Sequence, residues 1–187
     1  MIYLKLWEFI KKSRNYFLIA SIIFIISAVI GFIFPVFFID YIQSFIEKIS
    51  ELTAGMGFFR LFLFILGNNL QAAFIVTLSG ILFGIFPVLL AVFNGYVLGF
   101  VANKAVGALG ASVLLRLLPH GIFEIPALIL SLGLGLRLGM FVFRKKGKRK
   151  KEVVYSFVNS VRVFFYIILP LLIIAALIES ALIVLLK

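Results

Sequence analysis

Residues 61–103 read LFLFILGNNLQAAFIVTLSGILFGIFPVLLAVFNGYVLGFVAN and carry no charged side chain. A helix needs about 20 apolar residues to cross the hydrocarbon core of a bilayer, so this stretch is too long for one span and long enough for two. The segment GIFP, residues 84–87, offers a break, because proline ends or kinks a helix. The stretch therefore predicts two spans, at about residues 61–84 and 87–106.

The rest of the chain is also too apolar for a soluble domain. Hydrophobic residues make up 64% of the 187 residues, charged residues make up 13%, and the mean hydropathy is +1.25. Three further spans are predicted at about 16–39, 119–143 and 161–186. The first of these is too long for a signal peptide and lacks a small-residue cleavage site, so we interpret it as an uncleaved span. The chain is predicted to be a single all-α domain, a polytopic bundle of about five spans in the cell membrane.

The net charge of +11 is carried by short basic runs beside the apolar segments. Lys5, Lys11, Lys12 and Arg14 precede the first predicted span, and the expected loop RKKGKRKKE, residues 144–152, precedes the last. The positive-inside rule puts both runs in the cytoplasm, which requires an even number of crossings between them, and the four predicted spans before residue 144 meet this requirement. We therefore expect a cytoplasmic N-terminus and an outer C-terminus. We expect no nucleic-acid binding, because no soluble module is left to carry it, and the absence of cysteine excludes disulfides and thiolate sites.

Residues 40–57 form a predicted amphipathic outer segment. Apolar side chains recur at helical spacing in DYIQSFIEKISELTAGMG, with polar ones between them. One interpretation is a helix that lies flat on the outer membrane surface, and the other is an extension of the first helix beyond the membrane.

Glycine pairs four residues apart occur in three predicted spans, as GILFG (80–84), GYVLG (95–99) and GLRLG (135–139). Such strips let helix backbones approach closely in lipid, and they favour tight packing within the bundle. Because three strips exceed what five helices require, we also expect a homodimer.

A few polar side chains lie inside the predicted spans, where ionisable groups are costly and often functional. Counting along each span places Asn69, His120, Glu124 and Glu179 in one layer of the outer half, with Asn94 nearer the cytoplasm. His120 and Glu124 are four residues apart and share a helix face. Three uses of this polar layer remain open: a structural clasp, a site for a divalent cation such as Zn²⁺ held by His120, Glu124, Glu179 and Asn69, and a route for protons, ions or a polar solute.

Catalysis is not expected. The chain has one histidine, which cannot serve both a metal and a triad, and no HExxH motif is present. Arg137 lies seven residues before Arg144, so we expect its side chain to extend to the cytoplasmic interface.

Four segments, in this order and spacing, resemble the stage II sporulation protein M family: NNLQAAF, GILFGIFPVLLAVFNGYVLG, LLPHGIFEIPALILSLGLGLRLG and PLLIIAALIESAL. The similarity covers roughly residues 68–182, and PHGIFEIPA is its most specific part. On matching positions, the motif residues implied by the resemblance are Asn69, Asn94, Gly95, Pro119, His120, Gly121, Glu124, Pro126 and Glu179.

The resemblance implies a five-span membrane protein without enzymatic activity. In sporulating bacteria the family member is a membrane anchor that brings two wall-degrading partner proteins to the engulfing membrane. We therefore expect a non-catalytic scaffold with membrane or extracytoplasmic protein partners, whose partner surface is the segment from Asp40 to Arg60. The alternative is a transporter or channel for ions or small solutes, which predicts a wet cavity between the polar layer and Asn94.

Overall fold

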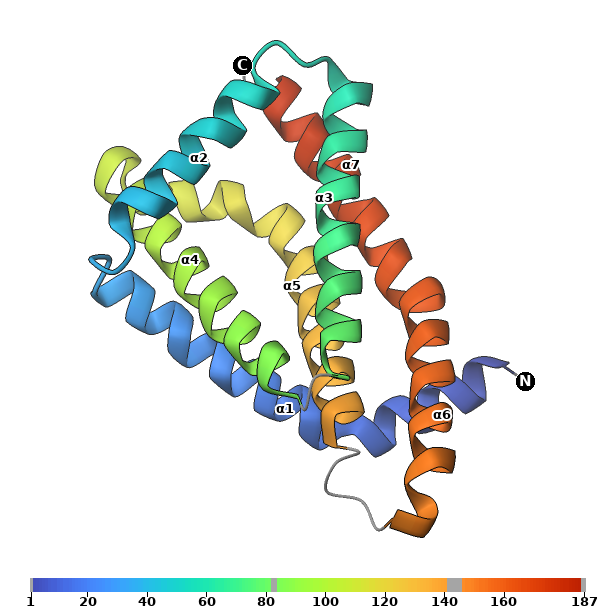
Figure 1. Ribbon diagram of the computed structural model, residues 1–187. Helices are drawn as coiled ribbons and strands as arrows, with labels where there is room; N and C mark the ends of the chain where they lie inside the picture. The colour runs from blue at the N-terminus through green and yellow to red at the C-terminus, as the bar shows by residue number, and fades with distance from the viewer. Residues whose placement is uncertain (1, 82–83, 141–145, 186–187) are drawn as a thin grey trace.

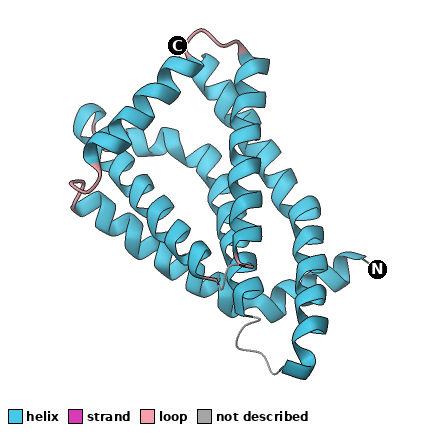
Figure 2. Ribbon diagram, in the orientation of Figure 1, coloured by secondary structure: helices cyan, strands magenta, loops and turns pink. Residues whose placement is uncertain are grey.

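The computed structural model describes residues 2–81, 84–140 and 146–185, and among them it contains helices and no strands (Figures 1 and 2). The side chains of residues 2, 3, 115–120 and 146–149 lie outside this description. The helices are α1 (Ile2–Ile33), α2 (Ile39–Thr53), α3 (Phe58–Ser79), α4 (Ile85–Leu109), α5 (Val113–Gly139), α6 (Lys146–Val163), the π-helical turn η2 (Phe164–Ile168) and α7 (Leu169–Leu185).

Five helices of the described chain are long and apolar enough to cross a membrane. They are Leu4–Ile33, Phe58–Ser79, Ile85–Leu109, Gly121–Gly139 and Lys150–Leu185. This confirms the predicted all-α bundle and the division of residues 61–103 into two helices. The second of these begins after Gly84, whose φ of +72° suits a residue without a Cβ atom.

The helical backbone is interrupted between α1 and α2, and this separates the amphipathic segment from the first span. Helix α1 ends at Ile33, six residues before the predicted limit of 39, because a residue that precedes proline disfavours helical backbone and Pro35 follows Phe34. Helix α2 is therefore a separate helix, and the alternative of an extended first helix is wrong.

Two helix pairs and a central helix make up the bundle. Helices α1 and α4 run side by side, α3 and α7 form a second pair, and α5 contacts all four of them (Figure 1). The first part of α5 runs across the molecule and the rest turns along the bundle (Figure 1). Gly121 and Pro126 lie in this helix, and proline removes a backbone hydrogen bond where helices bend.

Glycines set the closest approaches between these helices. A methyl group on Gly80, directly after α3, would overlap the carbonyl oxygen of Gly135 in α5, and one on Gly139 would overlap the backbone of Gly84. Likewise, a methyl group on Gly99 of α4 would overlap the carbonyl oxygen of Ala28 in α1. All three glycine strips are thus used inside one chain. The expected homodimer stays a prediction, but it no longer gains support from spare strips.

Helices α6, η2 and α7 are contiguous and form one long rod. The rod begins at Lys146, inside the segment 144–152, for which a loop was expected. Lysine, arginine and glutamate are good helix formers, so the basic segment continues the apolar helix into a polar environment. The π-helical turn ends two residues before Pro170, which cannot donate a backbone hydrogen bond to the preceding turn.

Candidate functional site

Four of the five predicted polar-layer residues lie on the inward stripes of their helices. Asn69 continues the stripe of buried residues Leu61, Ile65 and Ala73 on α3 at intervals of four. Glu124 precedes buried Ala127 of α5 by three residues, Asn94 follows buried Ala91 of α4 by three, and Glu179 follows buried Ala176 of α7 by three. All four side chains are half-buried. Helical spacing therefore turns each of these polar groups toward neighbouring helices.

The register of the helices spreads these residues over different depths. A Cβ atom on Gly135 of α5 would meet the carbonyl oxygen of Val76 in α3 and the side chain of Pro87 in α4. Asn69 lies seven residues from Val76, and Asn94 lies seven residues from Pro87, both toward the end of the bundle that carries α2. Seven helical residues span about 10 Å at 1.5 Å per residue. We call this end the α2 end. By this count Asn69 and Asn94 lie at similar distances from the contact, whereas Asn94 was expected nearer the cytoplasm.

The two carboxylates lie nearer the α2 end. Glu124 is eleven residues from Gly135 along α5, or about 16 Å along that helix. On α7, Ala176 packs with Leu61 and Ile65 of α3, and Glu179 lies three residues beyond Ala176 toward the α2 end. Asn69 lies four residues beyond Ile65 in the opposite direction. Counted along the helices, the two amides lie further from the α2 end than the two carboxylates, and the expected single layer with His120 stays a prediction.

One of the two amides already has a local partner. The Nδ2 atom of Asn94 donates a hydrogen bond to the carbonyl oxygen of Leu90 at 2.8 Å, one turn earlier on the same helix. Such a bond occupies one of the two amide hydrogens and leaves the other for a second acceptor.

The expected cation site is untested. His120 belongs to helix α5, but its side chain lies outside the described residues. Among the described side chains, no three of His, Cys, Asp and Glu are grouped so as to hold a metal ion. The site of His120, Glu124, Glu179 and Asn69 therefore stays a prediction, which elemental analysis of the purified protein would test.

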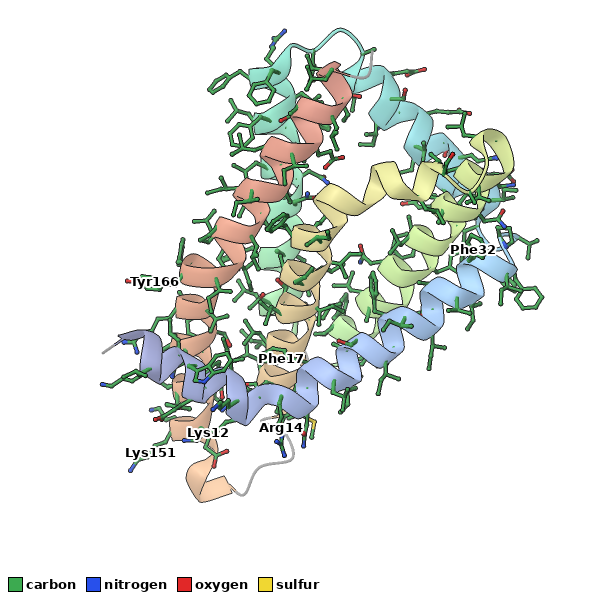
Figure 3. The ribbon with its side chains drawn as sticks, turned by 180° about the vertical axis from the view of Figure 1, so that it is seen from behind. Lys12, Arg14, Phe17, Phe32, Lys151 and Tyr166 are labelled. Atoms are coloured by element: carbon green, nitrogen blue, oxygen red, sulfur yellow. The ribbon has the colours of Figure 1, made fainter. Side chains whose placement is uncertain are left out.

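A second polar site joins three helices at the opposite end, which we call the basic end because it carries the cationic N-terminal part of α1 and the start of α6. Figure 3 shows Lys12, Arg14 and Lys151 at this end. Arg137 of α5 donates through Nη1 to the carbonyl oxygen of Phe9 at 3.2 Å and to the hydroxyl of Ser13, both on α1. Its Nε atom contacts Oγ of Ser156 on α6 at 3.5 Å.

The side chain of Arg137 also covers an aromatic ring. Its Cζ atom lies 4.1 Å from the centroid of the Phe9 ring, a distance at which the guanidinium is attracted to the ring face. Phe9 is fully buried. The expectation that Arg137 extends to the cytoplasmic interface stays a prediction, and the structure adds that α1 supplies acceptors for its guanidinium.

Tyr96 of α4 holds the turn from which α2 starts. Its hydroxyl donates to the carbonyl oxygen of Phe34 at 2.9 Å and accepts a hydrogen bond from the backbone N–H of Phe37 at 2.8 Å. Beside it, Ile42 of α2 is buried against Tyr96 and Phe100. The position of α2 is thus fixed by hydrogen bonds and by apolar contact.

Neither Arg137 nor Tyr96 was singled out as a site residue from the sequence. A signal existed for Arg137, because a charge inside an apolar helix is costly unless it is paired. For Tyr96 the signal was weaker. It was a tyrosine inside the strip GYVLG, and a buried tyrosine hydroxyl usually finds a hydrogen-bond partner.

A family model described as stage II sporulation protein M matches residues 20–182. The chain belongs to this family. Among curated proteins, an uncharacterized protein of Methanocaldococcus jannaschii is 31% identical over 183 aligned positions, which cover 90% of this chain and 81% of that protein. No solved structure matches the chain. With five helices of membrane-spanning length, the chain is a membrane protein of the stage II sporulation protein M family.

Proposed function

We propose that this family member is a non-catalytic scaffold of the cell membrane that presents α2 to a protein partner outside the cytoplasm. The observation that carries the proposal is the close packing of the helices at glycine. Where Gly80 meets Gly135 and Gly99 meets Ala28, the backbones touch, so no water-filled path can run between the helices at these two crossings. Crossings packed in this way suit a rigid platform better than a conduit.

Helix α2 has the properties of a partner surface. One face carries only exposed polar side chains, namely Asp40, Gln43, Ser44, Glu47, Lys48 and Glu51. Three carboxylates stand against one lysine on this polar face, so its charge favours a partner with basic residues. Because Tyr96 and Phe100 hold the opposite face through Ile42, the polar face is displayed in a fixed orientation. Such preorganisation lowers the entropic cost of binding.

The polar residues in the bundle then serve to join helices. Hydrogen bonds between helices contribute about 0.6–2 kcal/mol each in membranes, so such bonds from these side chains would stabilise the bundle. This role needs no catalytic group and no bound ion.

Site-specific photocrosslinking in cells that contain the protein tests the scaffold. A photoreactive amino acid replaces Gln43 on the polar face of α2, and a matched control replaces Ile25, an exposed apolar residue of α1. We expect a discrete crosslinked protein at position 43 that disappears when Glu47 and Glu51 are changed to lysine. The same product at positions 25 and 43, or no product at 43 in a folded chain, would contradict the proposal.

A further inference from the structure

A groove of about 460 Å³ lies at the basic end between the N-terminal part of α1 and helix α6. Lys5 and Arg162 line it with their cationic side chains, and Glu8 adds one carboxylate. The groove therefore carries a net positive charge, and all three charged side chains are solvent-exposed. It is separate from the polar residues of the bundle and from the polar face of α2.

The walls of the groove are partly apolar and partly able to form hydrogen bonds. Val154, Tyr155 and Val158 of α6 supply exposed apolar surface. Asn159, of which 6% is exposed, also lines the groove. Its Nδ2 atom donates one hydrogen bond to the carbonyl oxygen of Tyr155 at 2.8 Å, and a primary amide carries a second N–H for another acceptor.

Packing behind the groove keeps this arrangement in place. The Tyr155 ring stands edge-on to the Phe9 ring with 5.8 Å between centroids. The Arg137 guanidinium also contacts the Phe9 ring, so α5 fixes the α1 wall from behind. The Tyr155 wall of the groove thus packs against a buried aromatic residue.

The groove lies near the change from basic to apolar residues along the rod. Helix α6 carries Lys150 and Lys151 before it, while Val163 and Phe164, directly after Arg162, are buried in the apolar core. Arg162 thus marks the boundary between the basic and the apolar part of the rod. Trp7 on α1 is 57% exposed, with Lys11 Nζ 5.3 Å from its ring centroid, and tryptophan favours the membrane interface.

We propose that this groove binds the headgroup of an anionic phospholipid from the leaflet at the basic end. Lys5 and Arg162 attract the phosphate, the free N–H of Asn159 donates to a headgroup oxygen, and the valines contact the start of the acyl chains. Basic pockets between membrane helices bind anionic headgroups in this way. A free phosphate would use the same cations, but it would gain nothing from the exposed apolar wall.

Native mass spectrometry of the full chain in detergent tests the site, with phosphatidylglycerol as the probe and phosphatidylcholine for comparison. The variant Lys5→Ala/Arg162→Ala removes two cations from the groove. Its matched control, Lys12→Ala/Arg14→Ala, removes two exposed cations from the same end outside it. We expect the groove variant to bind phosphatidylglycerol about 25-fold more weakly, at about fivefold per cation, and the control to bind like wild type.

Two further measurements keep the result interpretable. Glu8→Gln removes the carboxylate that repels the phosphate, so it should strengthen binding about fivefold without removing any cation. Equal losses in the groove variant and the control would overturn the site, as would equal binding of both lipids by wild type. Competition by inorganic phosphate at the concentration of the lipid would show that a free phosphate, and not a lipid, is the ligand.

Discussion

Arg137 shows how one charged side chain is accommodated within an apolar bundle. Its guanidinium has a carbonyl and a hydroxyl of α1 as acceptors, an aromatic face beneath it and a hydroxyl of α6 beside it. Charged groups at membrane depth persist where the fold supplies such partners. In this molecule the arginine joins α1, α5 and α6 at the basic end.

Replacing Arg137 by alanine should destabilise the protein by about 2–3 kcal/mol, because hydrogen bonds of a charged donor and a cation–π contact are lost together. Thermal unfolding in detergent measures the effect. The matched variant Arg14→Ala removes an exposed arginine from the same end and should change stability little. Equal stability of the two variants would contradict the role assigned to Arg137.

The polar residues inside the spans could be picked out from the sequence. In the structure Asn69, Asn94, Glu124 and Glu179 are half-buried, and each lies three or four residues from a buried neighbour. Their depths were not predictable, because depth depends on the register between helices, which Gly135 and its contacts set. The acceptors of Arg137 were hidden for a similar reason, since Phe9 is 128 residues away in the chain.

At the level of the helices, glycine has two distinct roles, and the chain offers matched examples of them. Gly80→Ala and Gly99→Ala place a methyl group against the backbone of a neighbouring helix. Gly67 and Gly107 also lie inside helices but have no atoms within 4 Å of the added carbon.

We expect Gly80→Ala and Gly99→Ala to destabilise the bundle by about 1–3 kcal/mol through overpacking. Gly67→Ala and Gly107→Ala should be neutral or stabilising by up to about 1 kcal/mol, because alanine favours helix. Chemical unfolding of the four variants compares them directly. If all four behaved alike, close backbone contact would not be what holds the helices together.

The number and type of helices could be predicted from the sequence, whereas several of their limits could not. The uncharged length of residues 61–103 required two helices, and the helical spacing of apolar residues in 40–57 predicted α2. The end of α1 was missed, although Pro35 stood in the sequence, because the apolar run continues past it. The helical start of α6 was missed because charge pattern predicts the side of the membrane better than it predicts backbone conformation.

On the scale of the whole molecule, the basic end and the α2 end should face opposite sides of the membrane, with the basic end in the cytoplasm. The chain has no cysteine, so single cysteines can be introduced without removing any. A membrane-impermeant maleimide should label Ser44→Cys on α2 in intact cells. It should label Lys12→Cys only after the membrane is permeabilised. The reverse pattern would invert the orientation and place α2 in the cytoplasm.

Together, the backbone contacts, the tethered α2 and the Arg137 site favour the proposed platform over a conduit. Ion flux into vesicles containing the purified protein tests this claim most directly, with a pH-sensitive dye for protons and a cation-sensitive dye for K⁺. The account predicts rates equal to those of protein-free vesicles for wild type and for Glu124→Gln. Flux that exceeds this background in wild type and is lost in Glu124→Gln would contradict it and make the polar residues a permeation path.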